Sequence, residues 1–101
     1  MNAEKILSAL SLARRARKLV MGFDAVIDSV KKRETLLVLV SSELSPKTVK
    51  EAAFHCERLR VPMITAPVSL EEVERVLGKH SGVFGVTDQG FCKLLEKNAK
   101  Q

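Results

Sequence analysis

The chain has 101 residues, of which 46% are hydrophobic, and its 17 Lys and Arg outnumber 12 Asp and Glu to give a net charge of +5. This length and composition predict one globular domain over residues 1–101. The two cysteines, Cys56 and Cys92, lack the paired spacing of a zinc site or a disulfide-rich secreted scaffold, so we expect reduced, buried thiols in a cytoplasmic protein. No apolar run approaches the roughly 18 residues that a membrane span requires, so we expect no membrane partner.

The positive charge is concentrated in the first third of the chain. Residues 1–35 carry eight Lys and Arg against four Asp and Glu, whereas residues 36–101 carry nine against eight. Such a surplus favours an acidic partner, most commonly nucleic acid, although an ordinary solvated basic surface is the alternative. The densest cluster is Arg14, Arg15, Arg17 and Lys18. Cations at a helix end complement the helix dipole, but this cluster exceeds that need and favours a surface that faces phosphate.

The first half of the chain predicts helix, strand, helix and strand. Apolar residues at helical spacing indicate a first helix that Asn2 caps and that ends in the basic cluster. A short apolar run over residues 19–21 then reaches Gly22, and a second helix follows. The continuous apolar run from Leu36 to Val40 is typical of a strand covered on both faces, which makes it the best candidate for the central strand of a sheet.

The next segment predicts a third helix, a short strand and the start of a fourth helix. Ser45-Pro46 provides an N-cap followed by proline at the first helical position. This helix should stop before Val61-Pro62, because a residue that precedes proline avoids helical geometry, and residues 62–65 then form a strand. Ser69 and Glu72 have the spacing of a capping box that opens the fourth helix.

The last quarter completes the alternation of helices and strands. Gly78 can close the fourth helix, residues 83–86 form the last strand, and Asp88 caps a final helix. Residues 97–101 have no apolar pattern and should fray. The predicted order is α-β-α-β-α-β-α-β-α, which indicates an α/β fold with helices on both faces of a small sheet, a three-layer α/β/α sandwich.

The sequence makes no positive case for catalysis, a metal or a cofactor. Residues 78–85 are rich in glycine, but they lie between a helix and a strand, whereas a phosphate-binding loop opens a helix. A tight connection explains them better, although Lys79 and His80 could still touch a ligand. His55 and Cys56 are adjacent, and adjacent helical residues point about 100° apart, which disfavours the hydrogen bond that activates a thiolate. We therefore expect a protein that is not an enzyme.

The aromatic residues argue against base stacking on an exposed sheet. The chain has no Trp or Tyr, and its four Phe all fall in or beside predicted core elements. If the protein binds RNA, we expect it to do so through charge, backbone groups and shape, which suits a structured RNA better than a plain single strand.

Five phrases spread over nearly the whole chain carry a resemblance to a known family. They are residues 12–22 (LARRARKLVMG), residues 36–46 (LLVLVSSELSP), Cys56 with Val61-Pro62, residues 77–79 (LGK) and residues 86–91 (VTDQGF). Together they resemble the RNA-binding ribosomal proteins of the seven-Ae and thirty-e type, and particularly the small bacterial members. The resemblance implies a mixed four-stranded sheet between helices. It also implies recognition of kink-turns, which are sharply bent RNA elements with sheared G·A pairs.

In that family the RNA lies against three segments, which correspond here to residues 22–28, 41–44 and 79–83. A glycine that opens a helix lets RNA approach the backbone and leaves N–H groups free for acceptors, although it could merely permit the turn. Together with the basic residues on either side, the candidate RNA-binding residues are Arg14, Arg15, Arg17, Lys18, Gly22, Phe23, Asp24, Lys31, Lys32, Arg33, Ser42, Glu43, Lys79, His80, Ser81, Gly82 and Val83.

The start of the predicted second helix departs from the family pattern. Kink-turn binders of the family carry a pattern similar to Gly-x-Asn-Glu-x-x-Lys there. This chain instead has Asp24, Ala25 and Asp28 at the three polar positions. Asp28 would repel phosphate, and it can instead pair with Lys32 one turn later. Two hypotheses follow. The first is a monomeric protein that binds structured RNA, either ribosomal RNA or a kink-turn-like element; the second is a protein-interaction module that has lost this recognition.

Overall fold

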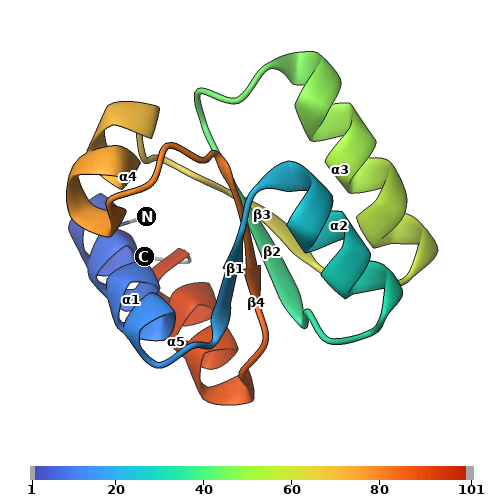
Figure 1. The fold of residues 1–101 in the computed structure, drawn as a ribbon, viewed down its shortest axis with the longest axis horizontal. Helices are drawn as coiled ribbons and strands as arrows, with labels where there is room; N and C mark the ends of the chain where they lie inside the picture. Colours follow the sequence, from blue (N-terminus) through green and yellow to red (C-terminus); the bar gives the residue numbers. More distant parts are fainter. Residues whose placement is uncertain (1, 100–101) are drawn as a thin grey trace.

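The computed structural model describes residues 2–99, which form five helices and four strands in strict alternation (Figure 1). The helices are α1 (Ala3–Arg15), α2 (Phe23–Lys31), α3 (Pro46–Arg58), α4 (Leu70–Leu77) and α5 (Gln89–Ala99). The strands are β1 (Leu19–Met21), β2 (Leu37–Ser41), β3 (Met63–Ala66) and β4 (Val83–Val86). The order of elements that the sequence predicts is confirmed.

The four strands form one mixed sheet in the order β1-β4-β2-β3. Strands β2 and β3 are parallel, whereas β4 is antiparallel to both of its neighbours, β1 and β2. Helices α1, α4 and α5 cover one face of the sheet, and α2 and α3 cover the other (Figure 1). The fold is therefore the predicted three-layer α/β/α sandwich around a small mixed four-stranded sheet.

Strands β1 and β2 finish, and β4 begins, at one end of the sheet, which we call the glycine end. There the N–H of Gly22, just after β1, donates to the carbonyl oxygen of Val83 at 3.1 Å. The N–H of Ser41, the last residue of β2, donates to the carbonyl oxygen of Gly82 at 2.8 Å. The connections that leave β1 and β2 therefore lie beside the connection that enters β4, although all three are far apart in the sequence.

The opposite end of the sheet, which we call the basic end, is where β1 and β2 begin and β4 finishes. The N–H of Thr87 donates to the carbonyl oxygen of Lys18 at 3.0 Å there, and the N–H of Leu36 donates to that of Val86 at 2.8 Å. Helices α1, α2 and α3 all finish at this end, because each leads into the start of β1, β2 or β3. The cations at these helix ends are Arg14, Arg15, Arg17, Lys18, Lys31, Lys32, Arg33, Arg58 and Arg60.

The sheet separates two apolar cores. Leu37 and Leu39 of β2 belong to the core under α1, α4 and α5, whereas Val38 and Val40 belong to the core under α2 and α3. All five residues of β2 are buried, as expected for an interior strand covered on both faces. The strand begins and ends one residue later than predicted, and Leu36 is 40% exposed because it precedes the covered part of the sheet.

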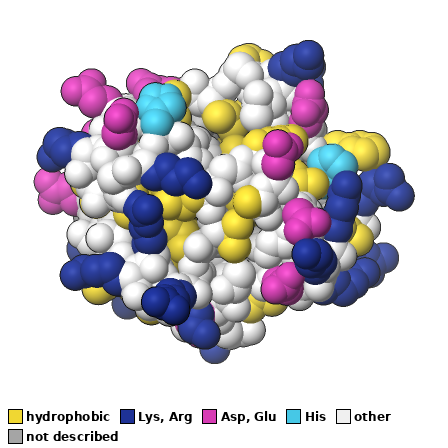
Figure 2. All heavy atoms as spheres, in the orientation of Figure 1, with side chains coloured by type: hydrophobic (Ala, Val, Ile, Leu, Met, Phe, Trp, Pro, Cys, Tyr) yellow, Lys and Arg dark blue, Asp and Glu magenta, His cyan; other side chains and the backbone are white. Residues whose placement is uncertain are grey.

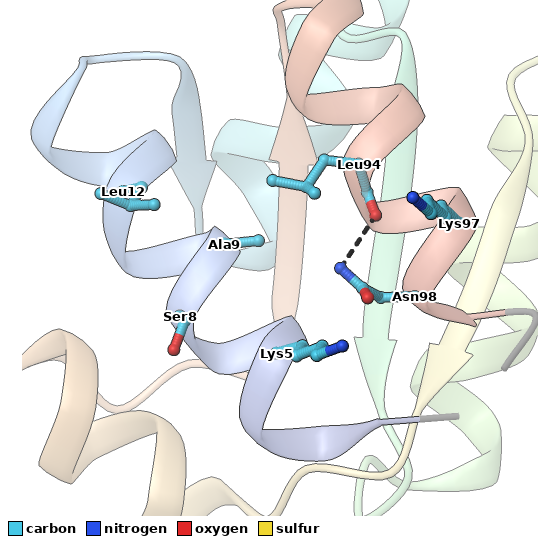
Figure 3. Close-up of a pocket in the computed structure, with 7 residues that line it drawn as sticks. All are labelled: Lys5, Ser8, Ala9, Leu12, Leu94, Lys97 and Asn98. Atoms are coloured by element: carbon cyan, nitrogen blue, oxygen red, sulfur yellow. Dashed lines mark hydrogen bonds between the residues drawn. The ribbon is translucent and has the colours of Figure 1, made fainter.

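The last helix is longer than the sequence predicts. The predicted fraying from residue 97 is wrong, because α5 continues to Ala99 and Asn98 is buried. The Asn98 amide donates to the carbonyl oxygen of Leu94 at 3.1 Å, and its backbone carbonyl accepts from the N–H of Asn2 at 3.3 Å. Figure 3 shows this side chain in the groove between α1 and α5. Because a polar residue packs the end of α5 against α1, the apolar pattern of the sequence does not predict this last turn. Residues 100–101 lie outside the described part of the chain.

Both cysteines are free and buried, as predicted. Cys92 packs in the core under α5 and Cys56 in the core under α3, so the sheet lies between the two thiols. Burial, with smaller contributions from the carboxylates of Glu96 and Asp88, raises the pKa of the Cys92 thiol from 9.0 to about 11. Burial is also the main reason that the pKa of Cys56 is raised.

We expect both thiols to resist alkylation by iodoacetamide at about pH 8 in the folded protein and to react quickly in urea. The unfolded chain ionises its thiols near 9.0, whereas folded Cys92 does so near 11, so stability should fall as pH rises through that window. Urea unfolding at several pH values tests this, and Cys92→Ala should show a shallower loss. Rapid alkylation of the native protein would contradict the prediction.

Candidate nucleic-acid interface

The start of α2 differs from the starts of the other helices in the described chain. Side chains cap α1, α3, α4 and α5 at Asn2, Ser45, Ser69 and Asp88, as the sequence predicts. Helix α2 instead begins at Gly22, which provides no side-chain cap among residues 2–99. Its first N–H groups, which have no acceptor within a helix, therefore point outward at the glycine end. This geometry leaves donors and a positive dipole end for an acceptor from outside.

Gly22 is required by its own backbone conformation. Its φ of 102° and ψ of 143° lie in a region that is essentially restricted to glycine. A Cβ atom at this position would meet nothing within 4 Å, so the space beside the residue is open. The junction thus combines a turn that only glycine makes easily with an unobstructed approach to the start of α2.

The structure brings together the three segments that the resemblance singles out, residues 22–28, 41–44 and 79–83. The backbone bonds of the glycine end join all three. A Cβ atom on Gly82 would lie 2.7 Å from Cδ1 of Leu44 and 3.0 Å from Cδ2 of Leu70, so the loop before β4 packs directly on the loop after β2.

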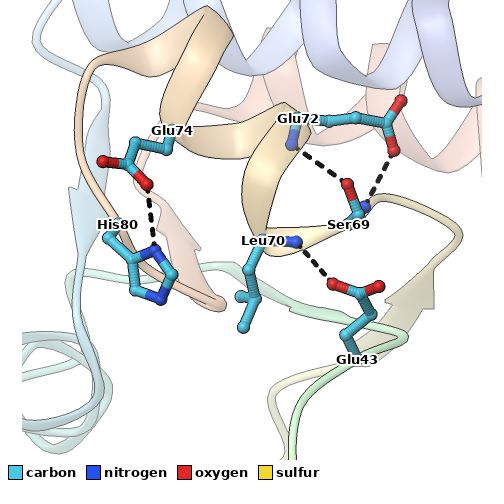
Figure 4. Close-up of polar contacts among 6 residues, drawn as sticks. All are labelled: Glu43, Ser69, Leu70, Glu72, Glu74 and His80. Carbon is cyan, nitrogen blue, oxygen red and sulfur yellow. Dashed lines mark hydrogen bonds and ion pairs between the residues drawn. The ribbon is translucent and has the colours of Figure 1, made fainter.

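Two polar candidates at the glycine end already have partners within the fold (Figure 4). The Glu43 carboxylate accepts from the N–H of Leu70 at 2.9 Å and so supports the start of α4. His80 lies 3.2 Å from the Glu74 carboxylate. These side chains therefore shape the loops, and each must leave or share its partner before it can contact a ligand.

Other candidates in the loop before β4 can offer little more than backbone. Ser81, Gly82 and Val83 are all buried, and the Ser81 hydroxyl donates to the carbonyl oxygen of Val83 at 3.1 Å. Lys79 in the same loop is exposed, and so is Ser42 in the loop after β2. The cation of Lys79 and the exposed backbone are the groups that this part of the glycine end presents.

Arg14 and Arg15, in the last turn of α1, lie against α4. They line an open hollow of about 420 Å³ with residues of both helices. The Arg14 guanidinium lies 3.8 Å from where a Cβ atom of Gly78 would be, which places it beside the loop that carries Lys79. Figure 2 shows Lys and Arg side chains gathered over α1 and this loop. Arg14, Arg15 and Lys79 therefore form one positive surface, which we call the α1 patch.

The remaining basic candidates do not reach the glycine end. Arg17 and Lys18 lie at the basic end, separated from Gly22 by the length of β1. The run from Lys31 to Arg33 lies at the far end of α2, about 13 Å along the helix axis. The two basic flanks surround Gly22 in the sequence but not in space.

Asp28 pairs with Lys32 as predicted, with 3.0 Å between the carboxylate oxygen and the ammonium nitrogen. The hydrogen bond and the charge of Asp28 raise the pKa of Lys32. Both side chains are mostly exposed, so the pair is solvated and adds little to stability. It does place a negative charge one turn beyond the open start of α2, and Asp24 adds another in the first turn.

Three residues near the end of α3, Phe54, Arg58 and Arg60, are not among the candidates that the sequence predicts. Phe54 lies in a core-packing helix, as the sequence predicts for all four Phe, but its side chain is 54% exposed. The Arg58 guanidinium lies 5.5 Å from the centre of the Phe54 ring, and Arg60 follows at the basic end. The spacing of Phe54 and Arg58, one helical turn apart, is a signal that could have found the pair.

Within residues 2–99, no three His, Cys, Asp or Glu side chains are grouped closely enough to hold a metal ion. Over the same residues, no helix combines the length and apolarity that crossing a membrane requires.

Two solved structures are similar to this protein in fold. A protein of unknown function from Bacillus halodurans superposes with a TM-score of 0.88 at 32% identity, covering 99% of this chain and 100% of that one. The 15.5kD RNA binding protein of Giardia lamblia superposes with a TM-score of 0.79 at 15% identity, covering 99% and 88%, which shows a shared fold.

Two curated relatives are both named RNA-binding protein YlxQ. The one from Bacillus subtilis is 37% identical over 91 residues, with 85% of this chain and 86% of the relative covered. The one from Enterococcus faecium is 30% identical over 92 residues, with 91% and 88% covered. Residues 4–96 match the Ribosomal protein L7Ae/L30e/S12e/Gadd45 family. The chain therefore belongs to that family, which confirms the membership that its sequence phrases predict.

Proposed function

We propose that this protein is a non-enzymatic RNA-binding protein whose RNA docks on the glycine end and the adjoining α1 patch. The observation that carries the proposal is the open start of α2, which faces outward where the three connections meet. The N–H groups there suit phosphate or base acceptors, and the α1 patch supplies attraction to the RNA backbone. Family membership and the names of the two curated relatives support the same ligand class.

The RNA proposed is a structured element of the kink-turn type, in ribosomal RNA or in a separate transcript, bound by a monomer in the cytoplasm. Kink-turn binders have Asn, Glu and Lys at three positions where this chain has Asp24, Ala25 and Asp28. We therefore expect fewer contacts between side chains and bases. Recognition then depends on shape, on the N–H groups of α2 and on phosphate contacts. The expected consequence is a preference for bent RNA over a plain duplex, with strong dependence on salt.

The test is a titration of a kink-turn RNA and a plain duplex of equal length at several salt concentrations. Replacing Arg14 and Lys79 together with glutamine should weaken binding and reduce the slope of log affinity against log salt by about 1.5, because roughly 0.7–0.9 is lost per phosphate contact. The matched control is Lys93→Gln with Lys97→Gln, which removes the same charge from α5. Equal effects of the two pairs would show a non-specific charge effect, and no salt-sensitive binding to either RNA would contradict the proposal.

Asp28 and Ala25 favour a second candidate, a protein-interaction module on the same fold. The Asp28–Lys32 pair occupies the position from which a lysine would meet phosphate. If loss of RNA recognition is located here, Ala25→Glu with Asp28→Lys should restore kink-turn binding to a protein otherwise inert towards RNA. A defined protein partner that survives nuclease treatment, without co-sedimentation with ribosomes, would favour the module over the RNA-binding proposal.

A further inference from the structure

A hollow at the ends of α2 and α3 combines planar, cationic and apolar groups. Its volume is about 290 Å³, and it is lined by Lys31 from α2 and by His55, Arg58 and Leu59 from the end of α3. The exposed Phe54 ring lies beside it, with 5.3 Å between its centre and that of the His55 ring and an angle of 76° between the planes. The ring thereby contacts both His55 and Arg58. Imidazole and guanidinium planes are the surfaces on which unpaired bases stack in RNA complexes.

A second observation, independent of the hollow, concerns the backbone of three arginines. Arg17, Arg33 and Arg60 have φ of 61°, 60° and 57°, the left-handed conformation in which glycine is preferred. Each follows the end of a helix, α1, α2 or α3, and all three helices finish at the basic end.

The hydrogen bonds show that these are the glycine positions of Schellman motifs. For α2, the N–H of Arg33 donates to Val30 and the N–H of Glu34 donates to Ser29. The same pair of bonds follows α1 and α3. A cation within the helix would satisfy the dipole without strain, so the dipole alone does not explain arginine here.

Arg33 and Arg60 are also neighbours in space. They line a second hollow of about 200 Å³ that shares Leu59 with the first. Over residues 28–34 and 55–60 the chain carries five Lys and Arg against Asp28, Glu34 and Glu57, and Asp28 is paired with Lys32. The two hollows therefore form one basic, partly apolar surface.

We propose that this surface is a second RNA contact, in which the first hollow takes one unpaired nucleotide. The base stacks on His55 and Arg58 over Leu59, with Phe54 holding the two planar groups in position. Lys31 contacts the phosphate of that nucleotide, and Arg33 and Arg60 contact the phosphates that follow. The ligand class rests on the proposed RNA-binding function, but the site is separate from the glycine end.

One RNA can reach both sites. The open start of α2 and Lys31 lie at the two ends of the same nine-residue helix, about 13 Å apart along its axis. Figure 1 shows α2 running from the glycine end to the end of α3. A single strand that leaves a structured element docked at the glycine end would therefore arrive at the hollow within a few nucleotides.

The first experiment measures binding of a fluorescently labelled short oligoadenylate by anisotropy, and the side-chain NMR signals of His55 in the unsubstituted protein show whether it binds at the hollow. His55→Ala and Arg58→Ala should each weaken binding by about tenfold, the size expected for loss of one stacked base. His55→Phe should retain binding because it keeps a stacking ring, whereas Arg58→Lys should not because it loses the plane. Arg14→Gln with Lys79→Gln is the matched control. This pair should weaken binding of the kink-turn RNA and leave the affinity for the oligoadenylate unchanged.

The second experiment separates folding from binding, because the two effects should have opposite signs. Arg33→Gly with Arg60→Gly should raise the melting temperature by about 5 °C through relief of backbone strain. The same pair of substitutions should weaken binding of the oligoadenylate several-fold, because two phosphate contacts are lost.

The outcomes distinguish this inference from the proposed function. Kink-turn binding with no response of His55 to oligoadenylate would overturn the second site and leave the proposed function intact. Oligoadenylate binding without kink-turn binding would support the second site and overturn the proposed kink-turn function. A polypeptide that shifts the His55 signals while RNA does not would overturn the inference in favour of a protein surface.

Discussion

Replacing Gly85 with alanine is expected to lower the free energy of unfolding by about 2–3 kcal/mol, at the upper end for an overpacked core. Its Cβ atom would lie 2.7 Å from Oγ1 and 3.1 Å from Cγ2 of Thr35, and 3.3 Å from Cγ1 of Val26. Thr35 is short and branched, and its hydroxyl is hydrogen-bonded to that of Ser29 at 2.7 Å. Strand β4 is paired on both sides, so neither the strand nor its neighbours can move away.

Thermal and urea unfolding measure this effect, and the melting temperature should fall by about 10–20 °C. Gly82→Ala is a matched control, since its Cβ atom would be equally close, at 2.7 Å, to Leu44. That neighbour is the flexible end of a half-buried side chain, so the loss should be smaller. Thr35→Ala should make Gly85→Ala less costly in the double variant. Equal losses at Gly82 and Gly85 would contradict the packing argument.

Replacing Gly22 with alanine is expected to cost about 1–3 kcal/mol and also to weaken RNA binding by about tenfold. The cost in stability comes from the backbone alone, because φ is 102° and a Cβ atom would meet nothing within 4 Å. The effect on binding comes from the same open space, where the added methyl group would hold RNA away from the start of α2.

The control for Gly22→Ala is Gly78→Ala, at the end of α4. Gly78 has φ of 75° and ψ of 10°, a left-handed conformation that the chain already gives to three arginines. The stability loss there should be near 1 kcal/mol and smaller than at Gly22. Unfolding curves and the kink-turn titration together decide the matter. Unchanged RNA affinity in a folded Gly22→Ala protein would remove the open start of α2 from the interface.

Local signals in the sequence predicted most of the elements. Ser45 and Ser69 start helices where their N-caps indicate, and Gly78 ends α4 in the left-handed conformation that closes a helix. These signals succeed because a cap or a turn depends on a few adjacent residues. The same reasoning failed for Asn98, whose burial depends on a groove formed by α1, and it did not show that Phe54 faces solvent.

The candidate site was predicted only in part. Family resemblance brought together the segments around Gly22, Leu44 and Gly82, and the structure places them at one end of the sheet. The resemblance could not show that Glu43 accepts from the N–H of Leu70 at the start of α4, or that His80 is paired with Glu74, because each contact joins separate elements. Arg14 likewise joins the loop of Lys79 only through the packing of α1 on α4.

The sequence by itself determined the order of elements, the helix caps and the family of this protein, because periodicity, capping and local phrases are properties of adjacent residues. Only the tertiary structure decided where the charges lie. Strand β1 and helix α2 each carry the chain across the length of the sheet, so Arg17 and Arg33 lie at the opposite end from Gly22. The cations that flank Gly22 in the sequence therefore lie together at the basic end, where Arg58 and Arg60 join them from another helix, and Gly22 lies at the other end of the sheet.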